Sequence, residues 1–128
     1  MEAETSLYEA VGGMGFFETL VGRFYAGVAI DPVLRRLYPG DDLGPATLRL
    51  TLFLAQYWGG PRTYDRERGH PALRMRHAPF GIGPDERDRW LAHMRNAIVS
   101  IAPAPDVTRA LIDYFEMAAD SLRNQPAG

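Results

Sequence analysis

The chain has 128 residues, of which 46% are hydrophobic and 23% are charged, values typical of one soluble globular domain. Its net charge of −2 gives no electrostatic reason to expect nucleic acid or an anionic membrane as a partner. Without cysteine there is no disulfide, thiolate nucleophile or iron–sulfur cluster, and no apolar run approaches the ~18 residues of a membrane span. We therefore expect a single cytoplasmic domain over residues 1–128, without a signal peptide.

Apolar residues recur with helical spacing through most of the chain, as in the row Phe16, Leu20, Phe24 and Val28. Prolines and glycines mark where such segments begin and end. In chain order, we expect a helical turn at 6–11 and helices over 16–28, 32–37, from Pro45 to the Gly59-Gly60-Pro61 stop, over 84–101 and over 105–123. No stretch alternates in the manner of a strand, so the sequence predicts an all-α fold with four substantial helices.

Residues 59–72 contain three glycines, two prolines and several charges, and we expect an irregular connection there. A single helical turn around 71–76 is expected before Pro79. An irregular stretch of this length in a small domain is usually functional or disordered. It leads directly to His77.

Three aromatic residues with polar tips occupy positions from which they can meet. Tyr25 lies in the apolar row of the 16–28 helix, Tyr38 follows the 32–37 helix, and Trp90 begins the apolar row of the 84–101 helix. Ala46, the smallest residue on the face of the helix between them, leaves space. Taken alone, each aromatic residue is more often a core residue whose polar tip reaches water or a carbonyl.

Conventional metal and nucleophile motifs are missing from the sequence. His70, His77 and His93 form no HxxxH pair, and neither a nucleophile elbow nor a phosphate-binding loop is present. A loop histidine such as His77 is, by itself, most often a surface residue. A metal that needs only one protein ligand fits this sequence better, and haem iron is the common case.

The chain resembles a group II truncated haemoglobin over essentially its whole length. The matching segments are "LYEAVGG" (7–13), "RFYAGVAIDPVLRRLYP" (23–39), "LFLAQYWGGPRTYDRERGHPALRMRHAPF" (52–80) and "ERDRWLAHM" (86–94). The resemblance implies a shortened globin in which two antiparallel helix pairs form a two-over-two sandwich around haem b. It also implies an extended loop before the proximal histidine, which would account for residues 59–72.

The resemblance assigns a role to particular residues of this chain. His77 matches the proximal iron ligand, and Tyr25, Tyr38 and Trp90 match the residues that stabilise a ligand on the distal side. The expected haem-pocket residues are Ala46, Leu50, Phe53, Leu54, Phe80 and Met94. The expected partners of the haem propionates are Arg49, Tyr64, Arg74 and Arg76, because arginine forms bidentate bonds with carboxylates.

The implied function is O2 binding with slow release. Bound O2 carries negative charge on its outer oxygen, and each donor to a charged acceptor contributes roughly 1.5–3 kcal/mol, or about ten- to a hundredfold in affinity. The alternative is a peroxidase or nitric-oxide dioxygenase that uses a separate reductase. No acid lies within four residues of His77, which favours ligand binding over peroxidase chemistry. A haem-free helical interaction module is a third hypothesis. Expected partners are O2, NO, CO, sulfide and peroxide, with a reductase and a homodimer as further candidates.

Overall fold

The computed structural model describes residues 6–38, 40, 42–68 and 82–122. Its helices are α1 (Leu7–Ala10), α2 (Met14–Ala29), α3 (Pro32–Arg35), α4 (Gly44–Tyr57), α5 (Thr63–Arg68), α7 (Pro84–Ile101) and α8 (Pro105–Leu122). No strand occurs in these ranges, and the predicted all-α class is confirmed. The four long helices begin and end within two or three residues of the predicted bounds.

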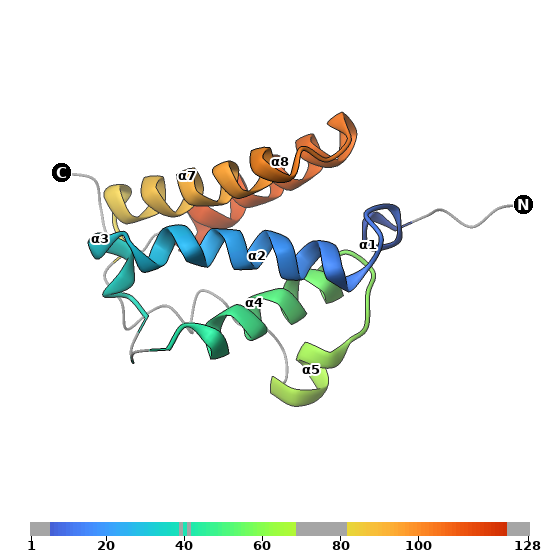
Figure 1. Cartoon of the computed structure of the whole chain (residues 1–128), viewed down its shortest axis with the longest axis horizontal. Helices are drawn as coiled ribbons and strands as arrows, with labels where there is room; N and C mark the ends of the chain where they lie inside the picture. The colour runs from blue at the N-terminus through green and yellow to red at the C-terminus, as the bar shows by residue number, and fades with distance from the viewer. Residues whose placement is uncertain (1–5, 39, 41, 69–81, 123–128) are drawn as a thin grey trace, which may run out of the picture.

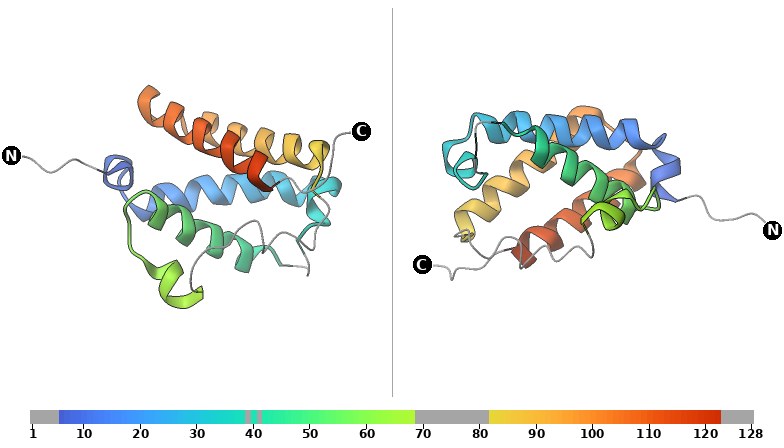
Figure 2. Two further views of the ribbon diagram at one scale, coloured as in Figure 1. Left: turned by 180° about the vertical axis from the view of Figure 1, so that it is seen from behind. Right: turned by 90° about the horizontal axis from the view of Figure 1, so that it is seen from below.

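The long helices form two antiparallel pairs. Helix α2 packs against α4, helix α7 packs against α8, and α2 also contacts α7 and so joins the pairs. The view from below in Figure 2 shows the α2–α4 pair lying across the α7–α8 pair. This is the two-over-two arrangement of a truncated globin. No helix of the described ranges has both the length and the apolar character needed to cross a membrane.

Local capping explains where the helices begin. The Asp31 carboxylate accepts a hydrogen bond from the Val33 N–H at 3.1 Å, and Pro32 occupies the first turn of α3. At the start of α7, the Glu86 carboxylate accepts from the Gly83 N–H at 2.7 Å, next to Pro84. These contacts satisfy backbone donors that have no partner inside a helix.

The core lies where the two helix pairs meet. Its largest fully buried side chains are Phe17, Leu20, Val21, Phe24, Val28, Leu34, Leu54, Met94, Ile98, Leu111 and Phe115. The predicted apolar row of α2 is therefore buried from Leu20 to Val28. Phe16, at the start of that row, is only partly buried and packs edge-on against Phe17.

Helix α5 corrects one prediction. We expected residues 59–72 to be irregular, but Thr63–Arg68 is helical. Tyr64 is 4% exposed, and its ring packs edge-on against Phe53 with 5.5 Å between centroids. Tyr64 is the one apolar residue in the sequence TYDRER, which is too little to produce a visible apolar period, so tertiary packing decides this helix. The turn expected at 71–76 lies outside the described residues.

Candidate functional site

Helix α2, the bend that follows α3, and helix α7 bring Tyr25, Tyr38 and Trp90 together. Tyr25 is 7% exposed on α2, and its ring meets that of Tyr38 edge-on, with 5.3 Å between centroids and 86° between planes. Trp90, on α7, contacts Phe24 at a centroid distance of 5.3 Å. The sequence predicted that these three residues would approach one another, and the structure places them in one cluster.

The polar tips of this cluster are directed at Tyr38. The Tyr25 and Tyr38 hydroxyls hydrogen-bond with each other, and the Trp90 indole, which has only a donor N–H, donates to the same Tyr38 hydroxyl. A phenolic oxygen has two acceptor positions and one proton. Whichever hydroxyl donates within the tyrosine pair, the other keeps its proton for a third group.

Burial keeps both phenols protonated. It is the main cause that raises the pKa of Tyr25, and the neighbouring Tyr38 raises it further, while the Arg49 cation opposes the shift. Burial also raises the pKa of Tyr38, against the hydrogen bonds from Tyr25 and Trp90. Near neutral pH, Tyr25 and Tyr38 are therefore neutral hydroxyl groups with a proton to donate.

Apolar side chains from α4 and α7 accompany this cluster. Ala46, Phe53, Leu54 and Met94 are buried in the core, and Leu50 packs against it partly exposed. These are the five expected pocket residues that the structure describes, and all belong to the same core as Tyr25. The sixth, Phe80, lies outside the described residues.

The other expected site residues divide into three cases. Arg49 is exposed on α4, and its positive charge opposes the rise in the pKa of Tyr25. Tyr64 is buried against Phe53. The iron ligand His77 and the propionate candidates Arg74 and Arg76 lie outside the described residues, as does His70. Their roles stay predictions.

The described side chains fit one face of a haem. Haem is a flat apolar ring with two carboxylates, and a ligand held on one face needs hydrogen-bond donors directed at it. An apolar wall, three polar tips and a nearby cation are the groups that such a cofactor requires. This agreement concerns the distal side.

One contact beside the cluster has no signal in the sequence. His93 is partly exposed, and its ring nitrogen Nε2 lies 2.8 Å from the buried Asp31 carboxylate. Asp31 also caps α3. The two residues are 62 positions apart, and no spacing rule connects them.

Known proteins resemble the chain along nearly its full length. Residues 6–124 match the family model described as bacterial-like globin. The Group 2 truncated hemoglobin YjbI of Bacillus subtilis is 37% identical over 118 residues, covering 92% of this chain and 88% of that protein. The solved structure of a thermostable hemoglobin from the actinobacterium Thermobifida fusca is 57% identical, with a TM-score of 0.92, and covers 96% of this chain and 100% of that one. The group II truncated hemoglobin from Bacillus anthracis is 34% identical, with a TM-score of 0.93, and covers 99% of this chain and 97% of that one.

Proposed function

The chain belongs to the bacterial-like globin family, among its group II truncated haemoglobins, and from this premise we propose that it binds O2 at haem b and releases it slowly. Family membership makes haem the cofactor and small diatomic molecules the ligands. The finer proposal assigns His77 to the iron and Tyr25, Tyr38 and Trp90 to the ligand. The observation that carries it is that Tyr25 and Trp90 both hydrogen-bond with the buried Tyr38 hydroxyl.

Haem, when bound, supplies an iron centre that takes up O2, NO and CO reversibly. On the proximal side, the neutral His77 imidazole would bind through Nε2, which leaves Nδ1–H for a carbonyl or carboxylate acceptor. His77 is the last residue of the "RGHPALRMRH" segment (68–77), which is part of the family resemblance. This support comes from the sequence.

On the distal side, we assign different roles to Tyr25, Tyr38 and Trp90. We propose that Tyr38 accepts hydrogen bonds from both Tyr25 and Trp90, which leaves its own hydroxyl proton available to a ligand; the hydrogen bonding of both residues with Tyr38 supports this arrangement. In this arrangement the proton of Tyr25 is donated to Tyr38, whereas the single N–H of Trp90 is shared between the Tyr38 oxygen and the ligand. We therefore assign direct donation to Tyr38, with Trp90 as a second donor, and assign to Tyr25 the role of orienting the Tyr38 hydroxyl.

Such donors slow the release of a ligand that carries partial negative charge. A hydrogen bond to a charged acceptor contributes about 1.5–3 kcal/mol, which corresponds to about ten- to a hundredfold in the dissociation rate if the association rate is unchanged. A protein that releases O2 this slowly is a poor bulk carrier. It suits O2 scavenging, or the oxidation of a second small molecule such as nitric oxide or peroxide.

The test is stopped-flow measurement of O2 dissociation from the haem-loaded protein. We expect Tyr38→Phe and Trp90→Phe to accelerate release about ten- to a hundredfold, and Tyr25→Phe to accelerate it less. Tyr57→Phe is the matched control, because Tyr57 is 51% exposed on α4. Release rates within twofold of wild type for Tyr25→Phe, Tyr38→Phe and Trp90→Phe alike would refute the proposal.

The same preparation separates ligand binding from redox catalysis. Repeated turnover of peroxide or nitric oxide with an added reductase system, lost in Tyr38→Phe, would identify a redox enzyme. Reaction limited to one equivalent per haem would identify a binding protein. A reductase partner, a homodimer, a cytoplasmic location and a single domain over 1–128 stay predictions from the sequence.

A further inference from the structure

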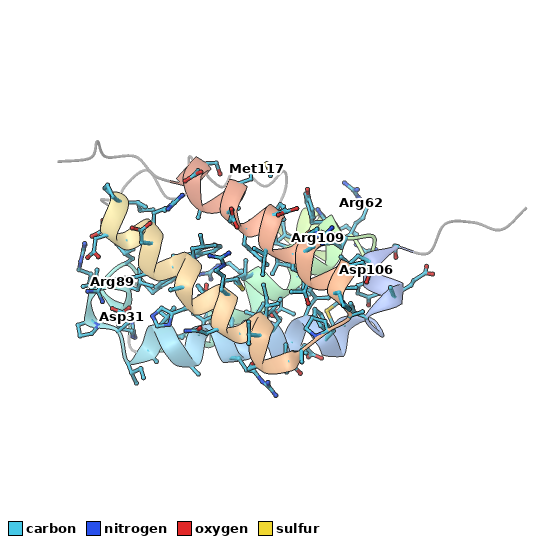
Figure 3. All side chains as sticks on the ribbon, turned by 90° about the horizontal axis from the view of Figure 1, so that it is seen from above. Asp31, Arg62, Arg89, Asp106, Arg109 and Met117 are labelled. Atoms are coloured by element: carbon cyan, nitrogen blue, oxygen red, sulfur yellow. The ribbon has the colours of Figure 1, made fainter. Side chains whose placement is uncertain are left out.

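Asp31 is a buried carboxylate held between two parts of the fold. It is 8% exposed, and every hydrogen bond it accepts comes from α3 or α7. Oδ1 accepts from the backbone N–H groups of Val33 and Leu34 and, at 3.2 Å, from Arg89. Oδ2 lies 2.8 Å from Nε2 of His93. Figure 3 shows the Asp31 and Arg89 side chains together where α3 approaches α7.

The two side chains that contact the Asp31 carboxylate lie on either side of Trp90 along α7. Arg89 directly precedes Trp90 on α7, and His93 follows Trp90 by about one helical turn. On the other side, Asp31 caps α3, and the Tyr38 N–H donates to the Arg35 carbonyl at the end of that helix. Asp31 and His93 therefore connect the segment that carries Tyr38 with the helix that carries Trp90.

The backbone of α2 is shaped to accommodate the His93 ring. A Cβ atom built on Gly27 would lie 2.5 Å from Nδ1 of His93, closer than real side chains approach. The His93 ring therefore packs directly against the backbone of α2 at Gly27. Gly27 lies one helical turn before Asp31 and two residues after Tyr25. Both of its nitrogens are confined, Nε2 by the carboxylate and Nδ1 by the helix.

Joining two helices through a buried charge has a high cost in desolvation free energy. An apolar pair of similar volume often stabilises a fold as well or better, because burying an ion costs several kcal/mol in desolvation. A directional contact, in contrast, fixes one geometry between the elements it joins. Here those elements carry Tyr38 and Trp90, whose mutual hydrogen bond depends on their separation.

We propose that Asp31 and His93 form a positioning pair that fixes Tyr38 relative to Trp90 and thereby sets the rate of ligand release. This inference rests on the proposed function, because it acts through the two donors. Neither residue touches the ligand. Loss of the pair leaves the donors in place but less well aligned.

Asp31→Asn is the main test variant. Asparagine caps helices about as well as aspartate, so α3 keeps its start while the charge that holds Arg89 and His93 is removed. His93→Leu removes the same contact from the other side. The matched control is Glu116→Gln, which removes the exposed Arg95–Glu116 pair at 3.4 Å between α7 and α8.

Two readouts apply to the haem-loaded protein. The first is O2 release by stopped flow. The second is hydrogen exchange of the Trp90 indole N–H by NMR, identified by its absence from the Trp90→Phe spectrum. The indole of Trp58, at the end of α4, is an internal control, because general loosening of the fold would raise its exchange too.

Asp31→Asn and His93→Leu should each speed O2 release and Trp90 exchange about three- to tenfold, less than complete loss of a donor. The Trp58 exchange and the Glu116→Gln variant should stay within twofold. In a Tyr38→Phe background, Asp31→Asn should no longer change release, because a pair that acts through Tyr38 is coupled to it.

Two results would overturn the positioning role. One is unchanged release and exchange in Asp31→Asn while Tyr38→Phe and Trp90→Phe accelerate release. The other is the same acceleration by Asp31→Asn with and without Tyr38. If the donor variants leave release unchanged, the proposed function is refuted instead. The Trp90 exchange then decides the positioning role, which faster exchange in Asp31→Asn supports and unchanged exchange overturns.

Discussion

Replacing Gly27 with alanine should destabilise the protein, although alanine is the better helix former. Within a helix, alanine is favoured over glycine by about 0.8–1 kcal/mol. At Gly27, however, the added methyl would lie 2.5 Å from Nδ1 of His93. The ring must move, and its contact with the Asp31 carboxylate at 2.8 Å is then lost or weakened.

The net effect follows from these two terms. A hydrogen bond to a charged group contributes about 1.5–3 kcal/mol, so Gly27→Ala should lower the free energy of unfolding by about 0.5–2 kcal/mol. For a chain of this length that is a fall of about 2–8 °C in Tm. The assay is thermal and urea unfolding of the haem-loaded protein, followed by circular dichroism.

Two controls make the sign of the effect informative. Gly22 lies on the same helix with nothing within 4 Å of an added Cβ, so Gly22→Ala should stabilise by about 0.8–1 kcal/mol. In a His93→Ala background, Gly27→Ala should stabilise by the same amount, because the ring is gone. Stabilisation by Gly27→Ala in the wild-type background would refute the reasoning.

Three further outcomes are expected. The hydrogen bond from His93 is the main cause that lowers the pKa of Asp31. The stability that the Asp31 carboxylate contributes is therefore present above about pH 4 and is lost as the pH falls through the lowered pKa. The difference in free energy of unfolding between wild type and Asp31→Asn should shrink in acid, and a constant difference from pH 7 to pH 2 would contradict this. Phe115→Ala should cost about 3–5 kcal/mol in chemical denaturation, because Phe115 is 1% exposed, whereas Met117→Ala, 60% exposed on the same helix, should stay within about 0.5 kcal/mol. His77→Ala should lose the Soret spectrum of histidine-ligated haem while His93→Ala keeps it, and the reverse pattern would reassign the ligand.

The long helices could be predicted from the chain alone, because each buries one continuous stripe. In α7 the predicted and observed bounds coincide at Pro84 and Ile101, since Gly83-Pro84 and Pro103 mark its two ends. Helix α5 could not be predicted in this way. Its six residues include one apolar ring, Tyr64, which is buried against Phe53 of another helix.

The candidate site, too, could be predicted from the sequence only in part. Which residues belong to it, Tyr25, Tyr38 and Trp90, could be read from aromatic residues on apolar faces and from resemblance to a family. The hydrogen bonds among them could not, because no spacing along the chain says which polar tips meet. Only the folded chain makes the Tyr38 hydroxyl the common hydrogen-bond partner of Tyr25 and Trp90.

The sequence by itself determined the helix class, the long helices and the family, because these depend on local periodicity and on contiguous motifs. The tertiary structure alone decided that His93 meets Asp31 across 62 residues, with Gly27 leaving room for the ring. Such a contact depends on how α2 and α7 cross, which no spacing along the chain encodes. The physical reason is that helix packing brings together residues that are far apart in the sequence. A buried carboxylate such as Asp31 then accepts hydrogen bonds from the donors that the neighbouring helix places beside it.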